Sequence, residues 1–370
     1  MNDFKGLYIH IPFCIRKCKY CDFVSYCGQE ENYDLYIEKL SEEAEEFKGE
    51  NIDSVFIGGG TPTILSSAQL SKLLRTINNN FNISPDCEFS IEANPKTLDK
   101  EKLQILKYGG VNRISVGVQS FCDEELKKIG RIHNAENAYN TLVMIKDAGF
   151  ENLNIDLMLS LPGQNEDSLL KTLNRAMEIS PTHISCYSLI LEEGTRLFEE
   201  YQSGIYSETD DDYDRYLYHM TIDYLKKHGY DRYEISNFSK PGFQCRHNIK
   251  YWNCDEYIGL GTAAHSYYDS RRTYNTSKLS EYLKGNFHSD DITFLDREDK
   301  IKEYIIMRLR LAEGINENDF FMRFHEKFSD RYTAVTDKLI KLGLMSKDKN
   351  NYFLTERGTD ISNSVMCEFL

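Results

Sequence analysis

Three cysteines near the start of the chain are the residues whose type and spacing most directly indicate chemistry. Cys14, Cys18 and Cys21 form a C-x3-C-x2-C pattern directly after residues 7–13, a segment that reads as a β-strand. A loop with this spacing can bring three thiolates around one centre. Three cysteines on a four-iron cluster leave one iron open to an outside ligand, whereas a structural zinc site usually has four protein ligands. The spacing therefore predicts a [4Fe–4S] cluster.

The alternative for these cysteines is a zinc site completed by His10 or Cys27. The other cysteines of the chain are scattered, and its first residues show no charged start followed by a long apolar run. We therefore expect no signal peptide and a cytoplasmic, reducing environment, in which clustered cysteines indicate metal or redox chemistry rather than disulfides.

Composition narrows the class of protein further. The chain has 370 residues, of which 41% are hydrophobic and 28% charged, so it can fill a sizeable core. No stretch approaches the roughly 18 apolar residues that a membrane-spanning helix needs. The net charge of −15 opposes broad electrostatic binding to nucleic acid or to anionic lipid.

The elements that must position the cysteines alternate between strands and helices. Strand-like runs begin near residues 7, 54, 87, 113, 152 and 183, and each is followed by helical periodicity. Six strand–helix units in a row predict an α/β fold with a parallel sheet, either open or curled into a barrel. In such sheets the loops at the carboxyl ends of the strands carry the chemistry, which is where the cysteines fall.

The pattern changes after about residue 240. Residues 241–266 are rich in Gly, Asn and aromatic side chains and read as ordered loop, whereas helices with short linkers follow from about residue 296 and a hairpin is expected near residues 351–358. The sequence predicts three parts: a barrel-like domain at 1–240, a connecting region at 241–292, and a small C-terminal winged-helix-like domain at 293–370.

The cysteine motif resembles that of radical S-adenosylmethionine (SAM) enzymes, in which SAM chelates the open iron. The wider sequence resembles the oxygen-independent coproporphyrinogen III oxidase/dehydrogenase family. The short motifs of that family occur in the expected order over nearly the whole chain. That family implies a partial (β/α)6 barrel. The words are YIHIPFC from Tyr8, GGGTPT from Gly58, EANP from Glu92, GVQS from Gly117, GRIH from Gly130 and DLMLSLPG from Asp156.

The resemblance implies a set of SAM-binding residues at the ends of successive strands. Glycine lets a backbone approach a ligand closely, and a carboxylate can accept hydrogen bonds from ribose hydroxyls. For each position the alternative is a structural one: a tight turn, a packed phenol or a buried polar group satisfied by its neighbours. The residues carried over are Tyr8, Tyr20, Gly59, Gly60, Thr61, Glu92, Gln119, Arg131 and Asp156.

Three features depart from the dehydrogenases. Those enzymes continue the cluster motif to a fourth cysteine, where this chain has Phe23, and they carry an N-terminal extension where only seven residues precede Tyr8 here. The chain also contains an H-N-x-x-Y-W word at residues 247–252. These features resemble the heme chaperones of the HemW type, a branch of the same family.

The H-N-x-x-Y-W word is chemically suited to heme. His247 can be an axial ligand to heme iron, and Tyr251 and Trp252 offer flat apolar surface to a porphyrin. His265 is a second candidate ligand. The alternative is a structural corner in which Trp252 fills the core and His247 bonds a backbone carbonyl. Arg246 and Lys250 could pair with the heme propionates.

Two functions follow from the resemblance. The first is a heme chaperone that binds one [4Fe–4S] cluster, SAM and heme, with a heme-acceptor protein such as a membrane respiratory enzyme and an electron donor such as flavodoxin or ferredoxin as partners. The second is a dehydrogenase that uses the 5′-deoxyadenosyl radical to decarboxylate coproporphyrinogen propionates. The mixed charge of the C-terminal part argues against a third function as a nucleic-acid-binding regulator, so no nucleic-acid partner is expected.

Overall fold

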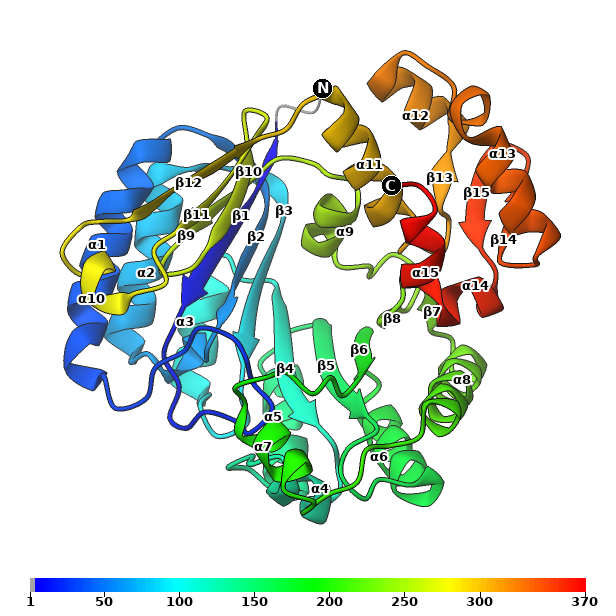
Figure 1. Cartoon of the computed structure of the whole chain (residues 1–370). Helices are drawn as coiled ribbons and strands as arrows, with labels where there is room; N and C mark the ends of the chain where they lie inside the picture. Colours follow the sequence, from blue (N-terminus) through cyan, green and yellow to red (C-terminus); the bar gives the residue numbers. More distant parts are fainter. Residues whose placement is uncertain (1–3) are drawn as a thin grey trace.

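The computed structural model describes residues 4–370, and Figure 1 shows a curved sheet with helices on its outer side. The order of the twelve strands in this sheet is β12-β11-β10-β9-β1-β2-β3-β4-β5-β6-β8-β7, and the seven from β9 to β6 are parallel. The parallel strands are β1 (Lys5–Ile11), β2 (Asn51–Gly59), β3 (Asn82–Ala93), β4 (Arg113–Gln119), β5 (Asn152–Leu159), β6 (His183–Ser188) and β9 (Tyr257–Leu260).

Antiparallel strands extend the sheet at both edges. At the edge next to β9 they are β10 (His265–Tyr268), β11 (Arg271–Asn275) and β12 (His288–Phe294). At the edge next to β6 they are β8 (Asn237–Ser239) and β7 (Asp231–Arg232). The sheet is therefore open, with no closure between its two edges in the described chain.

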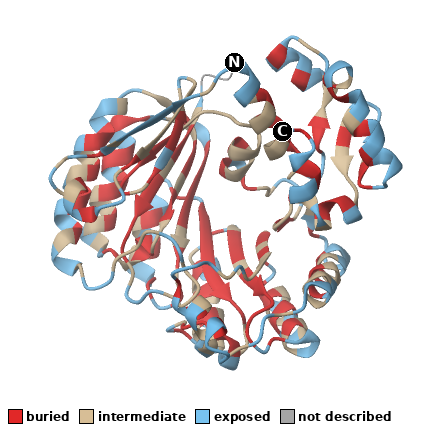
Figure 2. Ribbon diagram, viewed as in Figure 1, coloured by how far each residue is buried: buried red, intermediate tan, exposed pale blue. Residues whose placement is uncertain are grey.

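Helices cover the convex face of the sheet, so the strands are buried while the outer sides of the helices are exposed (Figures 1 and 2). α2 begins with a capping box between Ser66 and Gln69 and buries the side of the helix that carries Leu70, Leu73 and Ile77. The helices of this part are α1 (Tyr33–Ala44), α2 (Ser67–Asn80), α3 (Lys100–Tyr108), α4 (Asp123–Lys128), α5 (Ala135–Asp147), α6 (Glu166–Ile179), α7 (Arg196–Gln202) and α8 (Asp211–Lys227), with short 3-10 turns at η1 (Glu30–Asn32), η2 (Glu45–Phe47) and η3 (Pro62–Ile64).

The six strand–helix units are those predicted, and the α/β class with a partial barrel is confirmed. Residues 241–266 differ from the expected loop. They contain α9 (Arg246–Trp252), which lies on the concave side of the sheet in Figure 1, and β9, which pairs with β1. The short strand was missed because Gly259 and Gly261 interrupt its apolar run, and its partner is distant in sequence.

The C-terminal region has a hydrophobic core of its own, centred on Ile305, Phe320, Phe328 and Tyr352. α10 (Leu279–Tyr282) precedes this region and packs in the main core. The elements of the region are α11 (Arg297–Arg308), β13 (Ile315–Asn316), α12 (Glu317–Phe324), α13 (Phe328–Lys341), β14 (Met345–Asp348), β15 (Asn351–Leu354), α14 (Glu356–Asp360) and α15 (Ser362–Cys367). Three helices and the β13-β15-β14 sheet form the expected winged-helix-like arrangement.

The wing hairpin begins earlier than the sequence predicts. β14 and β15 pair across a turn at residues 349–350, and Thr355 ends the hairpin because its hydroxyl accepts from the Gly358 amide and caps α14. The division at residues 240 and 292 stays a prediction. No described helix has the length and apolar character needed to cross a membrane.

Candidate functional site

The loop that carries the three cysteines follows β1 and is tied down at several points. The Cys14 amide donates to the Tyr26 carbonyl at 2.9 Å, and the Tyr26 amide donates to Pro12 at 2.7 Å. Farther along, the Lys19 amide donates to Ile129 at 3.1 Å. These bonds place the loop at the carboxyl ends of the strands, as predicted.

The thiols of this loop face polar and cationic partners. Cys14 Sγ lies 3.6 Å from the Thr61 hydroxyl, and Arg131 Nη1 donates to Cys18 Sγ at 3.3 Å. Burial raises the pKa of Cys21 to about 11, and the neighbouring thiol of Cys18 adds to the rise. Three mutually close, unbridged thiols beside a guanidinium form a donor set that fits an iron–sulfur cluster, because the cation offsets thiolate charge.

The histidine that could complete a zinc site is already engaged. His10 bonds the Tyr8 hydroxyl through Nδ1 at 3.0 Å and the Val24 carbonyl through Nε2 at 2.9 Å. The zinc alternative therefore rests on Cys27, which lies close enough to Cys14 to raise the pKa of its thiol. In residues 4–370, no three His, Cys, Asp or Glu side chains are arranged around a single-ion position.

Two glycines at the end of β2, Gly59 and Gly60, are required by close packing against β1 and the residues that follow it. Gly59 has φ +102°, and a Cβ there would lie 2.4 Å from the His10 ring. A Cβ on Gly60 would lie 2.6 Å from the Phe13 carbonyl, and the Gly60 amide donates to Ile11. The predicted glycine positions are thus explained by contact between two strand ends.

Two predicted carboxylates face one another inside the sheet. Glu92 accepts from the Gly59 amide at 3.1 Å, and Asp156 accepts from Asn154 at 2.7 Å and from Ser115 at 3.3 Å. Burial, followed by the charge of Asp156, raises the pKa of Glu92 to about 8. Near neutral pH the Glu92 carboxyl is therefore largely protonated and can donate as well as accept a hydrogen bond.

Arg131 joins the cluster loop to the sheet. Besides Cys18, its guanidinium donates to the Asn94 side chain and to the Gly117 carbonyl, and its Nε is buried without a hydrogen-bond partner in the described chain. Asn94 in turn donates to Thr61 at 2.7 Å. The predicted residues Arg131 and Thr61 thus belong to one hydrogen-bonded chain that ends at two of the cysteines.

Tyr187 at the end of β6 is a central residue that the sequence analysis missed. Its hydroxyl donates to Gln119 at 3.2 Å, and its pKa is raised by burial and by the neighbouring Tyr20. Gln119 has φ +70°, an uncommon value for a non-glycine residue that is often found at functional sites. The alternation His183, Ser185, Tyr187 along β6 was the signal that could have placed it facing inward.

An aromatic pocket of about 620 Å³ opens between the cluster loop and α9. Phe23, Trp252 and Tyr257 supply flat apolar walls, and Arg272, held by Glu303 at 2.6 Å, supplies a cation. The lining residues are Tyr8, His10, Asp22, Phe23, Val24, Tyr251, Trp252, Cys254, Asp255, Tyr257, Ala263, His265, Tyr267, Arg272 and Met307.

His265 is the histidine of this pocket whose ring is free. It is exposed, and its ring stacks on that of Tyr274 with the two ring centres 5.4 Å apart. It makes no hydrogen bond or ion pair within the described part of the chain. Partial burial and the charge of Arg272 lower its pKa, so the imidazole is neutral and able to ligate metal.

His247 lies outside this pocket and is fully engaged. Its Nδ1 bonds the Ser54 hydroxyl at 3.0 Å and its Nε2 bonds the Tyr251 hydroxyl at 2.9 Å. Both partners are side chains, whereas the structural alternative for this residue was a bond to a backbone carbonyl. Burial lowers the pKa of His247 to about 3, with Lys250 contributing. Trp252, by contrast, lines the pocket beneath the Arg310 guanidinium, 4.6 Å from its ring centre.

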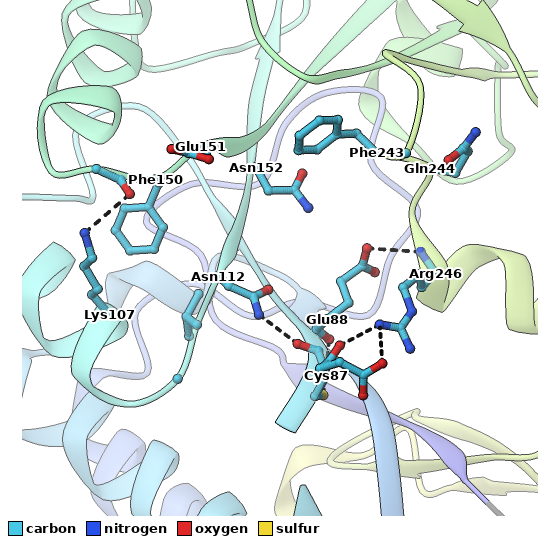
Figure 3. Close-up of a pocket in the computed structure, with 15 residues that line it drawn as sticks. Cys87, Glu88, Lys107, Asn112, Phe150, Glu151, Asn152, Phe243, Gln244 and Arg246 are labelled. Atoms are coloured by element: carbon cyan, nitrogen blue, oxygen red, sulfur yellow. Dashed lines mark hydrogen bonds and ion pairs between the residues drawn. The ribbon is translucent and has the colours of Figure 1, made fainter. Parts of the chain in front are cut away.

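Glu88 anchors the helix that carries His247. Its carboxylate accepts from the amides of Arg246 and His247, each at 3.1 Å, and so caps the first turn of α9. Figure 3 shows the bond to Arg246. Arg246 reaches the Asp86 carbonyl at 2.6 Å, and Lys250 pairs with Asp53 at 2.8 Å. Both cations expected at heme propionates are therefore bound to protein carboxylates or carbonyls.

Figure 3 shows a further pocket, of about 570 Å³, at the amino ends of β4 and β5. Phe150 and Phe243 form part of its wall, and Lys107 is turned toward the Ala148 carbonyl at 3.0 Å. The cluster cysteines and the predicted SAM residues do not line it, whereas Arg246, predicted to meet a heme propionate, does.

The fold and the cluster loop define a protein of the radical SAM class, and comparison supports this. The profile of the Radical SAM superfamily matches residues 8–176, and that of the HemN C-terminal domain matches residues 295–361. The solved structure of coproporphyrinogen III oxidase (HemN) from Escherichia coli superposes with a TM-score of 0.86 at 25% identity, over 99% of this chain and 90% of that one.

Curated sequences place the chain more narrowly. The protein named heme chaperone HemW of Lactococcus lactis is 37% identical over 98% of this chain and 96% of its own length. The protein of the same name from Bacillus subtilis is 36% identical over 99% of both chains. The chain belongs to the HemW family within the radical SAM superfamily.

Proposed function

We propose that this protein is a heme chaperone that carries one [4Fe–4S] cluster on Cys14, Cys18 and Cys21, binds SAM beside it, and holds heme for transfer to an acceptor protein in the cytoplasm. The observation that carries the proposal is the aromatic pocket. It is large, flat-walled and open to the cluster loop, and one neutral, unpaired imidazole lies on it. The names of the HemW relatives support the same function.

SAM is assigned to the carboxyl end of the sheet. A cluster with SAM supplies one-electron chemistry when both are bound. Glu92 would accept from or donate to ribose hydroxyls, and the phenol of Tyr20 would donate a hydrogen bond, since burial raises its pKa and keeps it protonated. Tyr187 would orient Gln119, to which its hydroxyl donates. The remaining proposed contacts are Tyr8, Gly59, Gly60, Thr61, Gln119, Arg131 and Asp156.

Heme is assigned to the aromatic pocket, with His265 as the axial ligand. Trp252, Tyr251 and Phe23 would cover the porphyrin faces, and burial of apolar surface supplies most of the affinity. Arg272, which forms an ion pair with Glu303, would also bind a heme propionate through a charge-assisted hydrogen bond. His247 supports Tyr251 rather than the iron, because both of its ring nitrogens are occupied.

The alternative function is coproporphyrinogen III dehydrogenase, which the likeness to HemN favours. The test reconstitutes the cluster anaerobically, then measures heme binding by the Soret band and, separately, protoporphyrinogen formed from coproporphyrinogen III with SAM and reductant. We expect stoichiometric heme, transfer to an apo-acceptor and no porphyrinogen product. Multiple turnovers to protoporphyrinogen would instead establish the dehydrogenase. Cys14→Ala, Cys18→Ala and Cys21→Ala should each abolish the visible cluster absorption, and a full four-iron signal in any of them would remove that ligand.

A further inference from the structure

Cys27, a cysteine close to the cluster loop, has no role in the site described above. It follows Cys21, the last cysteine of the cluster motif, by six residues, and its thiol is free and exposed. Cys14, Cys18 and Cys21 are only partly exposed, and every cysteine in residues 4–370 is unbridged. Because reagents in solution reach an exposed thiol first, Cys27 is the position in this region at which an oxidant acts most readily.

Backbone pairing brings Cys27 next to Cys14. Phe13 and Tyr26, which precede the two cysteines, form a parallel β-bridge. The Cys14 amide donates at 2.9 Å to the carbonyl of the peptide group that joins Tyr26 to Cys27. Standard backbone dimensions then hold the Cα atoms of Cys14 and Cys27 within about 7 Å of one another, the range that a disulfide can span. A disulfide between these two cysteines is therefore compatible with the bridge.

Both thiols lie near one phenol, that of Tyr33, whose ring packs on Phe13 with the ring centres 4.4 Å apart. Tyr33 is 5% exposed, and its hydroxyl is buried without a hydrogen-bond partner in residues 4–370. Burial, followed by the charges of Glu30, Cys14 and Cys27, raises the pKa of Tyr33 to about 12. The phenol therefore keeps its proton near neutral pH and is available to donate to an oxygen atom placed on a neighbouring sulfur.

We infer that Cys27 is a peroxide-sensitive thiol that forms a disulfide with Cys14 when the protein lacks its cluster, and that it thereby keeps this ligand in a recoverable form. The inference rests on the proposed cluster. A sulfur that pairs with a neighbouring thiol stops at a reversible disulfide, whereas an unpaired one is oxidised further to sulfinic acid, which thiol reductants do not reverse. Under reducing conditions the disulfide is transient, because thiol–disulfide exchange returns Cys14 to the cluster site.

The chemistry has two steps. Hydrogen peroxide converts the Cys27 thiol to a sulfenic acid, which retains one oxygen atom while the other leaves as water. The Cys14 thiol then attacks that sulfur: the S–S bond forms, the S–O bond breaks, and the departing hydroxide takes the thiol proton to give a second water. Two thiols thus lose two electrons in total, and one peroxide is reduced to two waters. The Tyr33 hydroxyl donates to the sulfenic oxygen as it leaves.

The first test maps the disulfide. Cluster-free wild type is treated with hydrogen peroxide, its remaining thiols are alkylated, and tryptic peptides are analysed by mass spectrometry before and after dithiothreitol. We expect two peptides joined through Cys14 and Cys27 that dithiothreitol separates. Trypsin cleaves after Arg16 and Lys19, so these cysteines fall in different peptides, and fragment ions distinguish Cys27 from Cys21. Disulfides confined to the three cluster cysteines would overturn the inference.

The second test rebuilds the cluster after peroxide has been removed and dithiothreitol added. Wild type should recover its visible cluster absorption, whereas Cys27→Ser should recover about threefold less, because Cys14 is then found as the sulfinic acid. Cys367→Ser, at an exposed cysteine of α15, is the matched control and should recover like wild type. Equal recovery in all three proteins would overturn the protective role.

Reconstitution without peroxide separates this inference from the proposed function. Cys27→Ser that has met no peroxide should rebuild the cluster as wild type does, which also shows that it folds. A failure there would make Cys27 a cluster ligand and overturn the inference. Failure of the proposed cluster itself is distinguishable, because untreated, reduced wild type would then show no cluster absorption while the joined peptides would still form.

Discussion

The concave side of the sheet has two layers that treat their charged groups differently. At the amino-end layer, Glu88 accepts from two helix amides and from the Cys245 thiol, and His247 has a partner on each ring nitrogen. In the carboxyl-end layer, Glu92 lies farther along the same strand, on the same face as Glu88. It accepts one hydrogen bond, from the Gly59 amide, and the nearby charge of Asp156 raises its pKa. Satisfied polar groups stabilise a fold, whereas groups short of partners are available to a ligand.

The H-N-x-x-Y-W motif, the most distinctive motif of the sequence, does not as a whole line the aromatic pocket. The residues of the H-N-x-x-Y-W word at 247–252 divide between two tasks: His247 fixes the helix to the sheet, while Trp252 reaches the pocket. His265, from a different segment, supplies the unpaired imidazole. A helix fixed by a satisfied layer can present other side chains to a ligand with little motion.

The largest expected effect comes from breaking the satisfied layer. Glu88→Ala removes the acceptor of two amides at the start of α9, one of them in a buried and one in a part-buried hydrogen bond, so we expect the free energy of unfolding to fall by about 3 kcal/mol. Chemical denaturation of the apo-protein measures it. Asp86→Ala, at the exposed neighbouring carboxylate, is the control and should leave the free energy of unfolding nearly unchanged, because solvent screens its ion pair with Arg246. Equal losses would mean that Glu88 does not anchor the helix.

A smaller effect distinguishes the two histidines. His265→Ala should weaken heme binding about tenfold, or about 1.4 kcal/mol, and shift the Soret band, because the axial ligand is lost while the apolar walls remain. His247→Asn should lower stability and leave the heme spectrum of the folded protein unchanged. A spectral shift in the His247 variant with none in the His265 variant would reverse the ligand assignment.

A pH dependence of stability tests the carboxyl-end layer through Glu92. The pKa of Glu92 is raised from 4.5 to about 8 in the folded protein, so its contribution to stability is fully present below pH 4.5 and is lost as the pH rises through 8. Thermal unfolding of the apo-protein should therefore show a falling Tm across this window. Glu92→Gln should flatten the slope, and an unchanged slope would show that Glu92 ionises without cost in the fold.

Much of the fold was predictable because it is encoded locally. The six strand–helix units follow from apolar periodicity, and capping residues such as Ser66, Asn134 and Asn165 mark helix starts directly in the sequence. The edge strands β9–β12 were not predictable in this way. They are short, contain glycine and aromatic residues, and owe their strand conformation to pairing with β1 and with one another.

The cluster motif, the strand–helix units and the residues at the strand ends could be identified from the sequence alone. Spacing along the chain is enough to bring three thiols into one loop, and the period of the apolar residues, two in strands and 3.6 in helices, is enough to identify the units. Which of the candidate ligand residues keep a nitrogen or oxygen atom without a hydrogen-bond partner depends on the tertiary structure. Whether His247 or His265 has an unpaired nitrogen depends on partners far away in sequence, since pairing and burial are set by contacts between strands and loops rather than by neighbours along the chain.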